Sequence, residues 1–180
     1  AWLLCLLVSA SLRGQALSSD DTFPSQPAEV RALRADFDAP AEQLRLRAIE
    51  LRDRQTDPAN RAWATLALIE FENELEHEDT VFALLDELIA ASADIEASDL
   101  RFAVLELSAV IYMHRNRTEQ SRAALDQMQS MVARSPNREW QTLVLHNEGV
   151  LQRKLGRFDQ ALAAFEAAAK LQRSGSNHTA

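Results

Sequence analysis

The sequence predicts an all-α protein built from stacked helical hairpins, and three observations lead to this prediction. Apolar residues recur at spacings of three and four along most of the 180 residues. Sustained alternation of apolar and polar residues between Asn-Gly or Asp-Gly turns does not occur, so nothing predicts a strand. Apolar positions also return roughly every 40 residues, a period typical of repeat proteins. We therefore expect a solenoid of about four hairpins, each too small to bury its own apolar face.

Start signals divide the chain into the expected helices. Asp57 before Pro58 combines a capping side chain with a proline at the first helical position. The other start signals are Asp38 ahead of Pro40, Ser98, Thr118 and Ser135-Pro136. The helices predicted in this way span residues 28–36, 40–54, 59–76, 80–92, 98–114, 118–133, 137–154 and 158–172.

Equivalent positions of successive hairpins can be aligned from the sequence. In the first helices, the residues 41 apart are Trp63, Val104 and Leu145. In the second helices, the spacings are 40, 40 and 37 residues for the set Leu44, Leu84, Ala124 and Ala161. Two further sets follow on the same face: Ala48, Leu88, Met128 and Phe165, then Leu51, Ala91, Met131 and Ala168. We expect these faces to pack between paired helices.

Composition excludes several classes of function. The 4 glycines are too far apart to form a phosphate-binding loop or a dinucleotide turn. A single cysteine, Cys5, excludes a disulfide framework and a thiolate metal cluster. The formal net charge of -8 argues against a nucleic-acid partner. The 4 histidines form no His-x-x-x-His pair, and no Gly-x-Ser-x-Gly motif is present. We expect no catalytic site, no metal site and no cofactor.

Two charged segments each allow two interpretations. The acidic run at residues 70–79 places glutamates at every second position, so they do not converge on one helical face as metal ligands would. It is either a solvated helix end or a weak divalent-cation site with His77. The first hairpin is locally basic, and either helix-surface ion pairing or a docking patch for an anionic partner explains its arginines: Arg31, Arg34, Arg45, Arg47, Arg52 and Arg54.

The last hairpin carries the most specific motif. Gly149 lies inside its first helix, Gly156 lies at its turn, and Phe158 follows two residues later. One face of its second helix then presents Ala161, Phe165 and Ala168. This pattern, over roughly residues 142–175, resembles a tetratricopeptide repeat.

The resemblance implies a right-handed solenoid and a role for each glycine. Gly149 would permit close helix contact, and Gly156 would form a left-handed cap over which Phe158 packs. Upstream, Trp63 fits the family's early aromatic residue, and Ser135-Pro136 fits its closing proline. The two middle hairpins lack both glycines and are longer than the family's repeat of about 34 residues.

The resemblance also implies a binding surface. In such arrays the first helices line a concave groove that holds a peptide or a partner protein. In the last hairpin the groove residues would be Leu143, His146, Asn147, Val150 and Arg153, with Asn147 placed to bond a ligand's backbone. By the repeat spacing, the preceding hairpins add Glu106, Ala109, Tyr112 and Met113, and Arg61, Thr65, Leu68 and Glu72. For Tyr112 and Met113, core packing is the alternative.

The N-terminus predicts export, to a bacterial periplasm or outside the cell. Residues 1–10 form an apolar run that is shorter than the roughly 20 residues needed to span a bilayer. Gly14 and Ala16 supply small residues for cleavage, so we interpret residues 1–16 as the remnant of a secretory signal. A buried N-terminal helix and a lipid anchor at Cys5 are the alternatives. We further expect a linker at 17–27, the repeat domain at 28–173, and a polar tail or a loop to a further repeat at 174–180.

Two functions remain open at this stage. The first is an exported, non-catalytic module that binds a protein or peptide in its groove, without nucleic acid and without a membrane span in this chain. The second is suggested by a resemblance to the exported sensory repeats of bacterial signalling proteins. In that case the chain would supply periplasmic input to a longer membrane-anchored diguanylate cyclase or histidine kinase. A structural role in envelope or secretion assembly is a third possibility.

Overall fold

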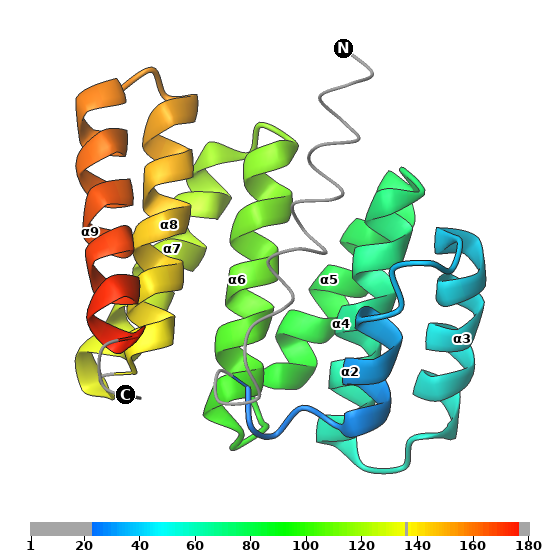
Figure 1. The fold of residues 1–180 in the computed structure, drawn as a ribbon. Helices are drawn as coiled ribbons and strands as arrows, with labels where there is room; N and C mark the ends of the chain where they lie inside the picture. Colours follow the sequence, from blue (N-terminus) through cyan, green and yellow to red (C-terminus); the bar gives the residue numbers. More distant parts are fainter. Residues whose placement is uncertain (1–22, 136, 177–180) are drawn as a thin grey trace. The chain divides into compact units, whose positions relative to one another are not determined.

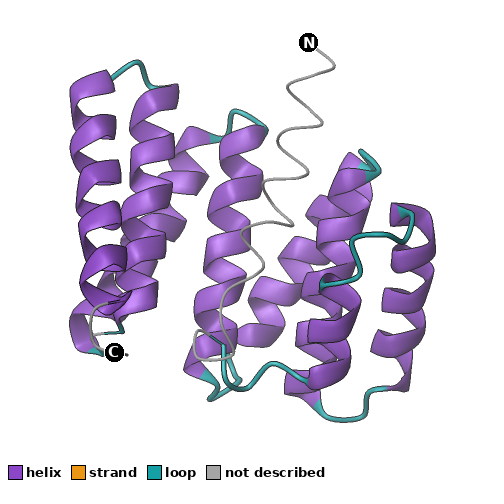
Figure 2. Cartoon of the chain, viewed as in Figure 1, coloured by secondary structure: helices purple, strands orange, loops and turns teal. Residues whose placement is uncertain are grey.

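The computed structural model describes residues 23–135 and 137–176, and every regular element within these ranges is an α-helix (Figures 1 and 2). The predicted all-α class is therefore confirmed, and the helix ends fall within a few residues of their predicted positions. The predicted secretory signal lies outside the described residues. The helices are α2 (Ala28–Arg34), α3 (Ala41–Arg54), α4 (Pro58–Glu74), α5 (Glu78–Ser92), α6 (Ser98–His114), α7 (Thr118–Arg134), α8 (Arg138–Lys154) and α9 (Phe158–Ser176).

The chain divides into two units, with the boundary inside α6, and each unit is described by itself. The first unit, Ala1–Val104, holds α2 to α5 and the start of α6. In it, α4 packs against both α3 and α5, and α2 packs against α3 and α4. The second unit, Leu105–Ala180, holds the rest of α6 with α7, α8 and α9. There α7 packs against α8, and α8 pairs with α9. Consecutive helices thus pack on one another, as in a solenoid of helical hairpins.

The hairpin turns repeat with a constant spacing of 40 residues. Glu76, Asn116 and Gly156 stand just after α4, α6 and α8, with positive φ angles of 61°, 60° and 75°. The same hydrogen bonds close all three turns. In the last of them, Gly156 N donates to Arg153 O at 3.1 Å and Arg157 N donates to Gln152 O at 2.9 Å. This pattern is a Schellman-type helix end, which requires one residue in the left-handed region.

The constant spacing corrects the alignment predicted from residue types. In the second helices, Ala161 is equivalent to Val81 and Ser121, and all three side chains are buried. The predicted equivalents, Leu84 and Ala124, were wrong by three residues. The predicted set in the first helices, spaced by 41 residues, was wrong by one residue per repeat. The error arose because similar residue types were matched, whereas the turn geometry fixes where each helix begins.

Side chains cap the starts of α4 and α8. Asp57 accepts a hydrogen bond from the amide of Asn60 at 2.8 Å, as its sequence signal predicts. Asn137 accepts one from the amide of Trp140 at 3.0 Å, so this residue, rather than Ser135, caps α8. No side chain caps α3, and the predicted start signal at Asp38 is not used for this purpose.

The core of the first unit reaches into the predicted linker. Phe23 lies against the fully buried Trp63, with ring centroids 5.7 Å apart and planes tilted by 59°. Ser25 accepts a hydrogen bond from Trp63 Nε1 at 3.1 Å. Ser25 also donates to the Asp99 carboxylate, through its amide at 2.7 Å and its hydroxyl at 2.8 Å. Phe23 and Ser25, which lie in the predicted linker, are therefore packed on the core of the first unit.

Candidate functional site

Three of the predicted groove residues share one face of α8. His146, Val150 and Arg153 are spaced by four and three residues, so they project from the same side of the helix. His146 and Val150 are half-exposed and Arg153 is exposed. We call these three residues the α8 strip. It offers an imidazole, an aliphatic side chain and a cation in a row.

The surroundings of His146 favour its neutral form. Its ring lies 5.5 Å from the ring of Phe165 on α9, at an angle of 57°. Burial, and then the positive charge of Arg153, lower the pKa of His146 below its usual value. The α8 strip therefore carries one permanent charge, at Arg153.

Asn147, beside the strip, is the most unusual of the predicted residues. It is 2% exposed, and its Nδ2 has no hydrogen-bond partner among the described residues. The equivalent positions in α4 and α6 hold Ala67 and Leu107, which are apolar and buried. A buried donor without a partner is costly, so such groups are rare and call for an explanation. The predicted contact of Asn147 with a ligand's backbone remains a prediction.

Two of the α6 residues of the predicted groove, Tyr112 and Met113, differ in exposure. Met113 is buried, whereas Tyr112 is half-exposed. The carbonyl of Met113 accepts a hydrogen bond from Lys154 Nζ, which ties the C-terminal end of α8 to the turn between α6 and α7. The side chain of Met113 therefore contributes to the core, and Tyr112 is the more accessible of the two.

Four more of the predicted groove residues lie on α4, in the first unit. Arg61 is exposed, while Thr65 is buried and donates its hydroxyl to the Arg61 carbonyl at 2.9 Å. Thr65 thus satisfies its hydroxyl on its own helix. Leu68 and Glu72 are buried as well. The α8 strip, Asn147, Tyr112 and Met113 belong to the second unit, and Arg61 and Thr65 belong to the first.

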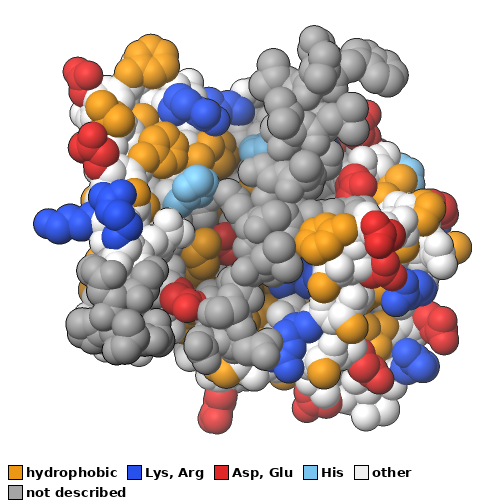
Figure 3. Space-filling view, viewed as in Figure 1, with side chains coloured by type: hydrophobic (Ala, Val, Ile, Leu, Met, Phe, Trp, Pro, Cys, Tyr) orange, Lys and Arg blue, Asp and Glu red, His pale blue; other side chains and the backbone are white. Residues whose placement is uncertain are grey.

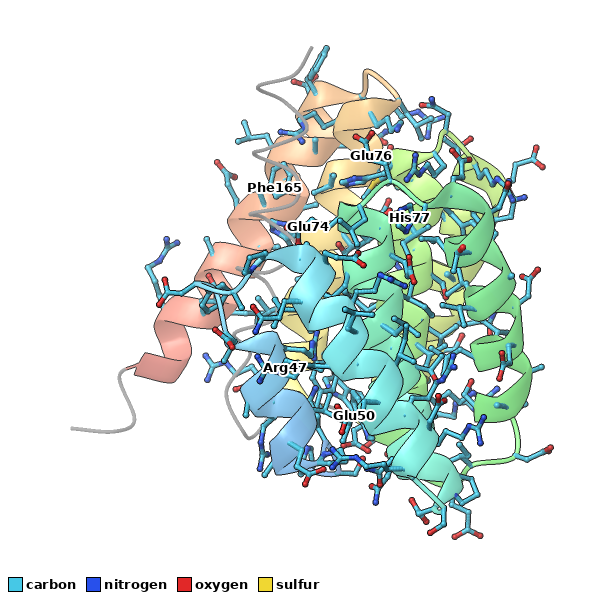
Figure 4. All side chains as sticks on the ribbon, turned by 90° about the vertical axis from the view of Figure 1, so that its right-hand side faces the viewer. Arg47, Glu50, Glu74, Glu76, His77 and Phe165 are labelled. Atoms are coloured by element: carbon cyan, nitrogen blue, oxygen red, sulfur yellow. The ribbon has the colours of Figure 1, made fainter. Side chains whose placement is uncertain are left out.

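The acidic run forms a structural contact at the end of α4. Glu72 is buried and accepts from His77 Nδ1 at 2.5 Å and from the guanidinium of Arg45 at 3.4 Å. Glu74, Glu76 and His77 lie around the α4–α5 turn (Figure 4). No group of three His, Cys, Asp or Glu side chains in residues 23–135 and 137–176 is arranged to hold a metal ion. In the structure, Glu72 and His77 bond each other at this helix end.

Ion pairing accounts for most of the basic first hairpin. Arg34 holds Glu70 through two bonds, of 2.9 Å and 2.6 Å, and both side chains are almost buried. Arg47 pairs with Asp36 at 2.6 Å. Two more pairs are Arg45 with Glu42 and Arg52 with Asp53. Arg34, Arg45, Arg47 and Arg52 are thus engaged within the hairpin and its neighbour α4.

The two glycines of the last hairpin have the properties that its motif predicts. A Cβ atom at Gly149 would lie 2.7 Å from Phe165 Cε1, so only glycine lets this ring approach α8. Gly156 has the positive φ of a left-handed cap. On α9, Ala161 and Ala168 are buried, and Phe165 is half-buried.

Phe158 does not pack over the cap as expected, because its side chain is 69% exposed. Its position falls on the outer edge of the hairpin, where the preceding second helices begin with Glu78 and Thr118. Two further large apolar side chains, Leu155 and Leu162, are also exposed there. These exposed residues were not predicted as a surface, although Phe158 and Leu162 are apolar residues outside the buried face of α9.

Comparison with known proteins agrees with this local geometry. Residues 142–174 match the family model of the tetratricopeptide repeat, which covers most of α8 and α9. Neither the curated proteins nor the solved structures contain a match to this chain. The protein is therefore a helical repeat protein whose last hairpin is a tetratricopeptide repeat, and the degenerate upstream hairpins are consistent with this architecture. Repeats of this family are protein-interaction modules and are generally not catalytic.

No helix within residues 23–135 and 137–176 is long and apolar enough to cross a membrane.

Proposed function

We propose that this chain binds a protein or peptide ligand through a surface that includes the α8 strip, and that it has no catalytic role itself. The observation that carries the proposal is the tetratricopeptide match at residues 142–174, because repeats of this family act by binding. The strip lies on the first helix of that matched hairpin.

The chemistry of the strip defines the ligand that we propose. Val150 and the neutral ring of His146 suit an apolar side chain, and Arg153 suits a carboxylate. Asn147 Nδ2 is a donor without a partner among the described residues. In the complex, a backbone carbonyl of the ligand accepts from this donor. The ligand is therefore a peptide segment with an apolar residue next to an acidic one.

A selection experiment tests this proposal. Peptides selected from a random displayed library on the intact chain are measured by fluorescence anisotropy against Arg153→Ala and Asn147→Leu. We expect both variants to raise Kd about tenfold or more, as the loss of a central contact does. Gln129→Ala, an exposed position on α7, is the control and leaves Kd unchanged. If no peptide is enriched, or if all variants bind equally, the proposal is wrong.

We also propose that the chain is exported, to a periplasm or outside the cell. The apolar run at residues 1–10 and the small residues at Gly14 and Ala16 support this. A fusion of the chain to alkaline phosphatase, which folds only after export, gives activity if this is correct. Deletion of residues 1–16 should abolish that activity, and an active deletion fusion would contradict export by this segment.

A second candidate function is periplasmic sensory input to a membrane-anchored diguanylate cyclase or histidine kinase. The resemblance of this chain's repeats to the exported sensory repeats of bacterial signalling proteins favours it. Sequencing of the gene downstream of residue 180 tests it. An apolar span of about 20 residues followed by a catalytic domain would support this function. A stop codon or further repeats would leave the binding module as the function.

A further inference from the structure

Residues 23–26 form a turn that is bound on the first unit, and we call them the 23–26 turn. The amide of Gln26 donates to the Phe23 carbonyl at 3.1 Å, which closes the turn. Figure 1 shows this segment beside the start of α6, ahead of α2. Its serine, Ser25, contacts Trp63 of α4 and Asp99 of α6, which lie 38 and 74 residues further along the chain. These contacts with distant residues resemble those of a bound peptide.

Side chains of the first unit bind three features of this turn. The Phe23 ring packs on Trp63, with ring centroids 5.7 Å apart. The Ser25 hydroxyl accepts from Trp63 Nε1 at 3.1 Å and donates to Asp99 Oδ1 at 2.8 Å. The Ser25 amide donates to Asp99 Oδ2 at 2.7 Å. Because Trp63 and Asp99 are both buried, they form a fixed site for an aromatic ring, a hydroxyl group and one backbone amide.

This site lies in the row of positions from which the groove was predicted. By the constant spacing of 40 residues, Trp63 is equivalent to Ala103 of α6 and to Leu143 of α8, a predicted groove residue. Asp99 precedes Ala103 by one helical turn, so the two residues share one face of α6. Within the first unit, the 23–26 turn therefore crosses α4 and the start of α6, as a peptide in the predicted groove would cross the first helices.

The 23–26 turn stands in place of part of a helix. The first helices of the later hairpins, α4, α6 and α8, have 17 residues each, whereas α2 has 7. Pro24 and Pro27 have no amide hydrogen to donate, so α2 does not extend back through the turn. The turn is therefore held by its side-chain contacts rather than by helical hydrogen bonds. Segments of this kind open at a lower free energy than core helices.

The turn is not the best occupant of its own site. Gln26 is 7% exposed, and its Nε2 has no hydrogen-bond partner among the described residues. A buried donor without a partner costs free energy in the bound state, and an apolar residue at this position removes that cost. A second copy of the chain would bring the same glutamine, so exchange between two copies gains nothing. A partner with an apolar residue there gains affinity.

We propose that residues 23–26 are an intramolecular ligand that closes the site of Trp63 and Asp99. A segment of a partner protein exchanges with them, and it has the pattern Phe-x-Ser followed by an apolar residue. This proposal goes beyond the function proposed above, because it concerns a site of the first unit and does not involve the α8 strip.

The test uses a peptide designed from the chain itself. The probe is a labelled copy of residues 22–27 that carries Gln26→Leu and has blocked termini. It is uncharged, which avoids electrostatic binding to the basic and acidic side chains that are interspersed over α2 and α3 in Figure 3. Fluorescence anisotropy measures its binding to the natural chain and to the full-length double variant Phe23→Ala with Ser25→Ala, whose own turn is bound less tightly.

We expect saturable binding to the double variant and an apparent Kd about tenfold higher for the natural chain. The attached turn competes at an effective concentration of about 1 mM, which is about ten times a probe Kd of about 0.1 mM. A probe that retains Gln26 should bind less tightly than the designed one. In the double variant, Asp99→Asn should raise Kd about tenfold or more. Gln129→Ala, an exposed position of the other unit, is the matched control and leaves Kd unchanged.

Absence of saturable binding to the double variant below about 1 mM overturns the proposal. An equal Kd for the natural chain and the double variant, or an unchanged Kd with Asp99→Asn, also overturns it. If circular dichroism shows that the double variant does not fold, Ser25→Gly alone replaces it, because this variant keeps the Phe23 ring. A dimer of the natural chain that the double variant dissociates in sedimentation would overturn the proposal in favour of exchange between two copies. Arg153→Ala and Asn147→Leu test the α8 strip separately, so either proposal can fail alone.

Discussion

Gly149 of α8 and Phe165 of α9 form a small-to-large pair at the centre of the last hairpin. A side chain at Gly149 would place its Cβ 2.7 Å from Phe165 Cε1 and 2.8 Å from Cδ1. The equivalent positions hold Ala109 with Leu125 in the preceding hairpin, and Ile69 with Leu85 before that. Phe165 is the largest of the three residues on the second helices, and it faces glycine, the smallest of the three on the first helices, as close packing requires.

We predict that the effect of Gly149→Ala changes sign with the residue at position 165. In the natural chain, the added methyl group clashes with the Phe165 ring, which costs about 1–3 kcal/mol and outweighs the higher helix propensity of alanine, about 1 kcal/mol. In a Phe165→Ala background the clash is gone, and the same change should stabilise by about 0.5–1 kcal/mol. Urea denaturation of the four proteins in this cycle provides the measurement. Equal effects in both backgrounds would mean that the two residues do not touch.

Phe165→Ala alone should lower the free energy of unfolding by about 2–3 kcal/mol. This lies below the roughly 3–5 kcal/mol of a fully buried phenylalanine, because Phe165 is half-buried. The same denaturation series measures it. A loss below about 1 kcal/mol would contradict the packing of the ring on α8.

At the three positive-φ turns, we expect introducing glycine to stabilise the protein and removing glycine to destabilise it. Glu76 and Asn116 adopt φ angles of 61° and 60°, which are unfavourable for most side chains, especially for glutamate. Glu76→Gly should therefore stabilise the protein by roughly 0.5–1 kcal/mol, and Asn116→Gly by less, because asparagine tolerates this region. Gly156→Ala should destabilise by about 1 kcal/mol, although a Cβ there has open space. Thermal and urea unfolding measure all three, and a destabilising Glu76→Gly would contradict the turn geometry.

From the Arg34–Glu70 ion pair we predict that substitutions of these two residues, on α2 and α4, have strongly non-additive effects on the free energy of unfolding. Two charge-assisted bonds join these nearly buried side chains, so removal of one partner leaves the other charge without compensation. Glu70→Ala should cost about 2–4 kcal/mol, since buried pairs lose about 3–5 kcal/mol and this one is slightly exposed. The double change Arg34→Met with Glu70→Leu should cost much less, because the equivalents of Glu70 are Val110 and Val150. If the double variant is as unstable as Glu70→Ala, the charge explanation is wrong.

Because the pKa values of two histidines are lowered in the folded protein, we predict that the free energy of unfolding decreases in mild acid. Burial, followed by nearby positive charges, lowers the pKa of His114 and of His146 below their ordinary 6.5. Below pH 6.5 the unfolded chain therefore binds protons that the folded protein resists, and the free energy of unfolding falls until the folded pKa values are passed. Urea denaturation between neutral and mildly acidic pH measures this fall. It should be smaller in the double variant His114→Gln with His146→Gln, and an unchanged slope would exclude these residues as its source.

Local signals in the sequence were sufficient to predict the class of the fold and its most specific part. Helical periodicity is a local signal, because residues three and four apart share one helix face. The two glycines of the last hairpin were recognisable for the same reason, since a left-handed turn and a close helix contact each favour glycine. The family match at residues 142–174 falls where these signals gather.

The tertiary structure alone decided the register of the upstream repeats and the exposure of the candidate residues. Glu76 and Asn116 form the same left-handed turn as Gly156 without being glycines, so no residue type marked the constant spacing. Helical spacing placed Asn147 and Phe158 on particular faces, but only the packing of neighbouring helices buried the asparagine and left the phenylalanine exposed. Burial depends on what covers a residue, and that is set by contacts between segments far apart in the chain.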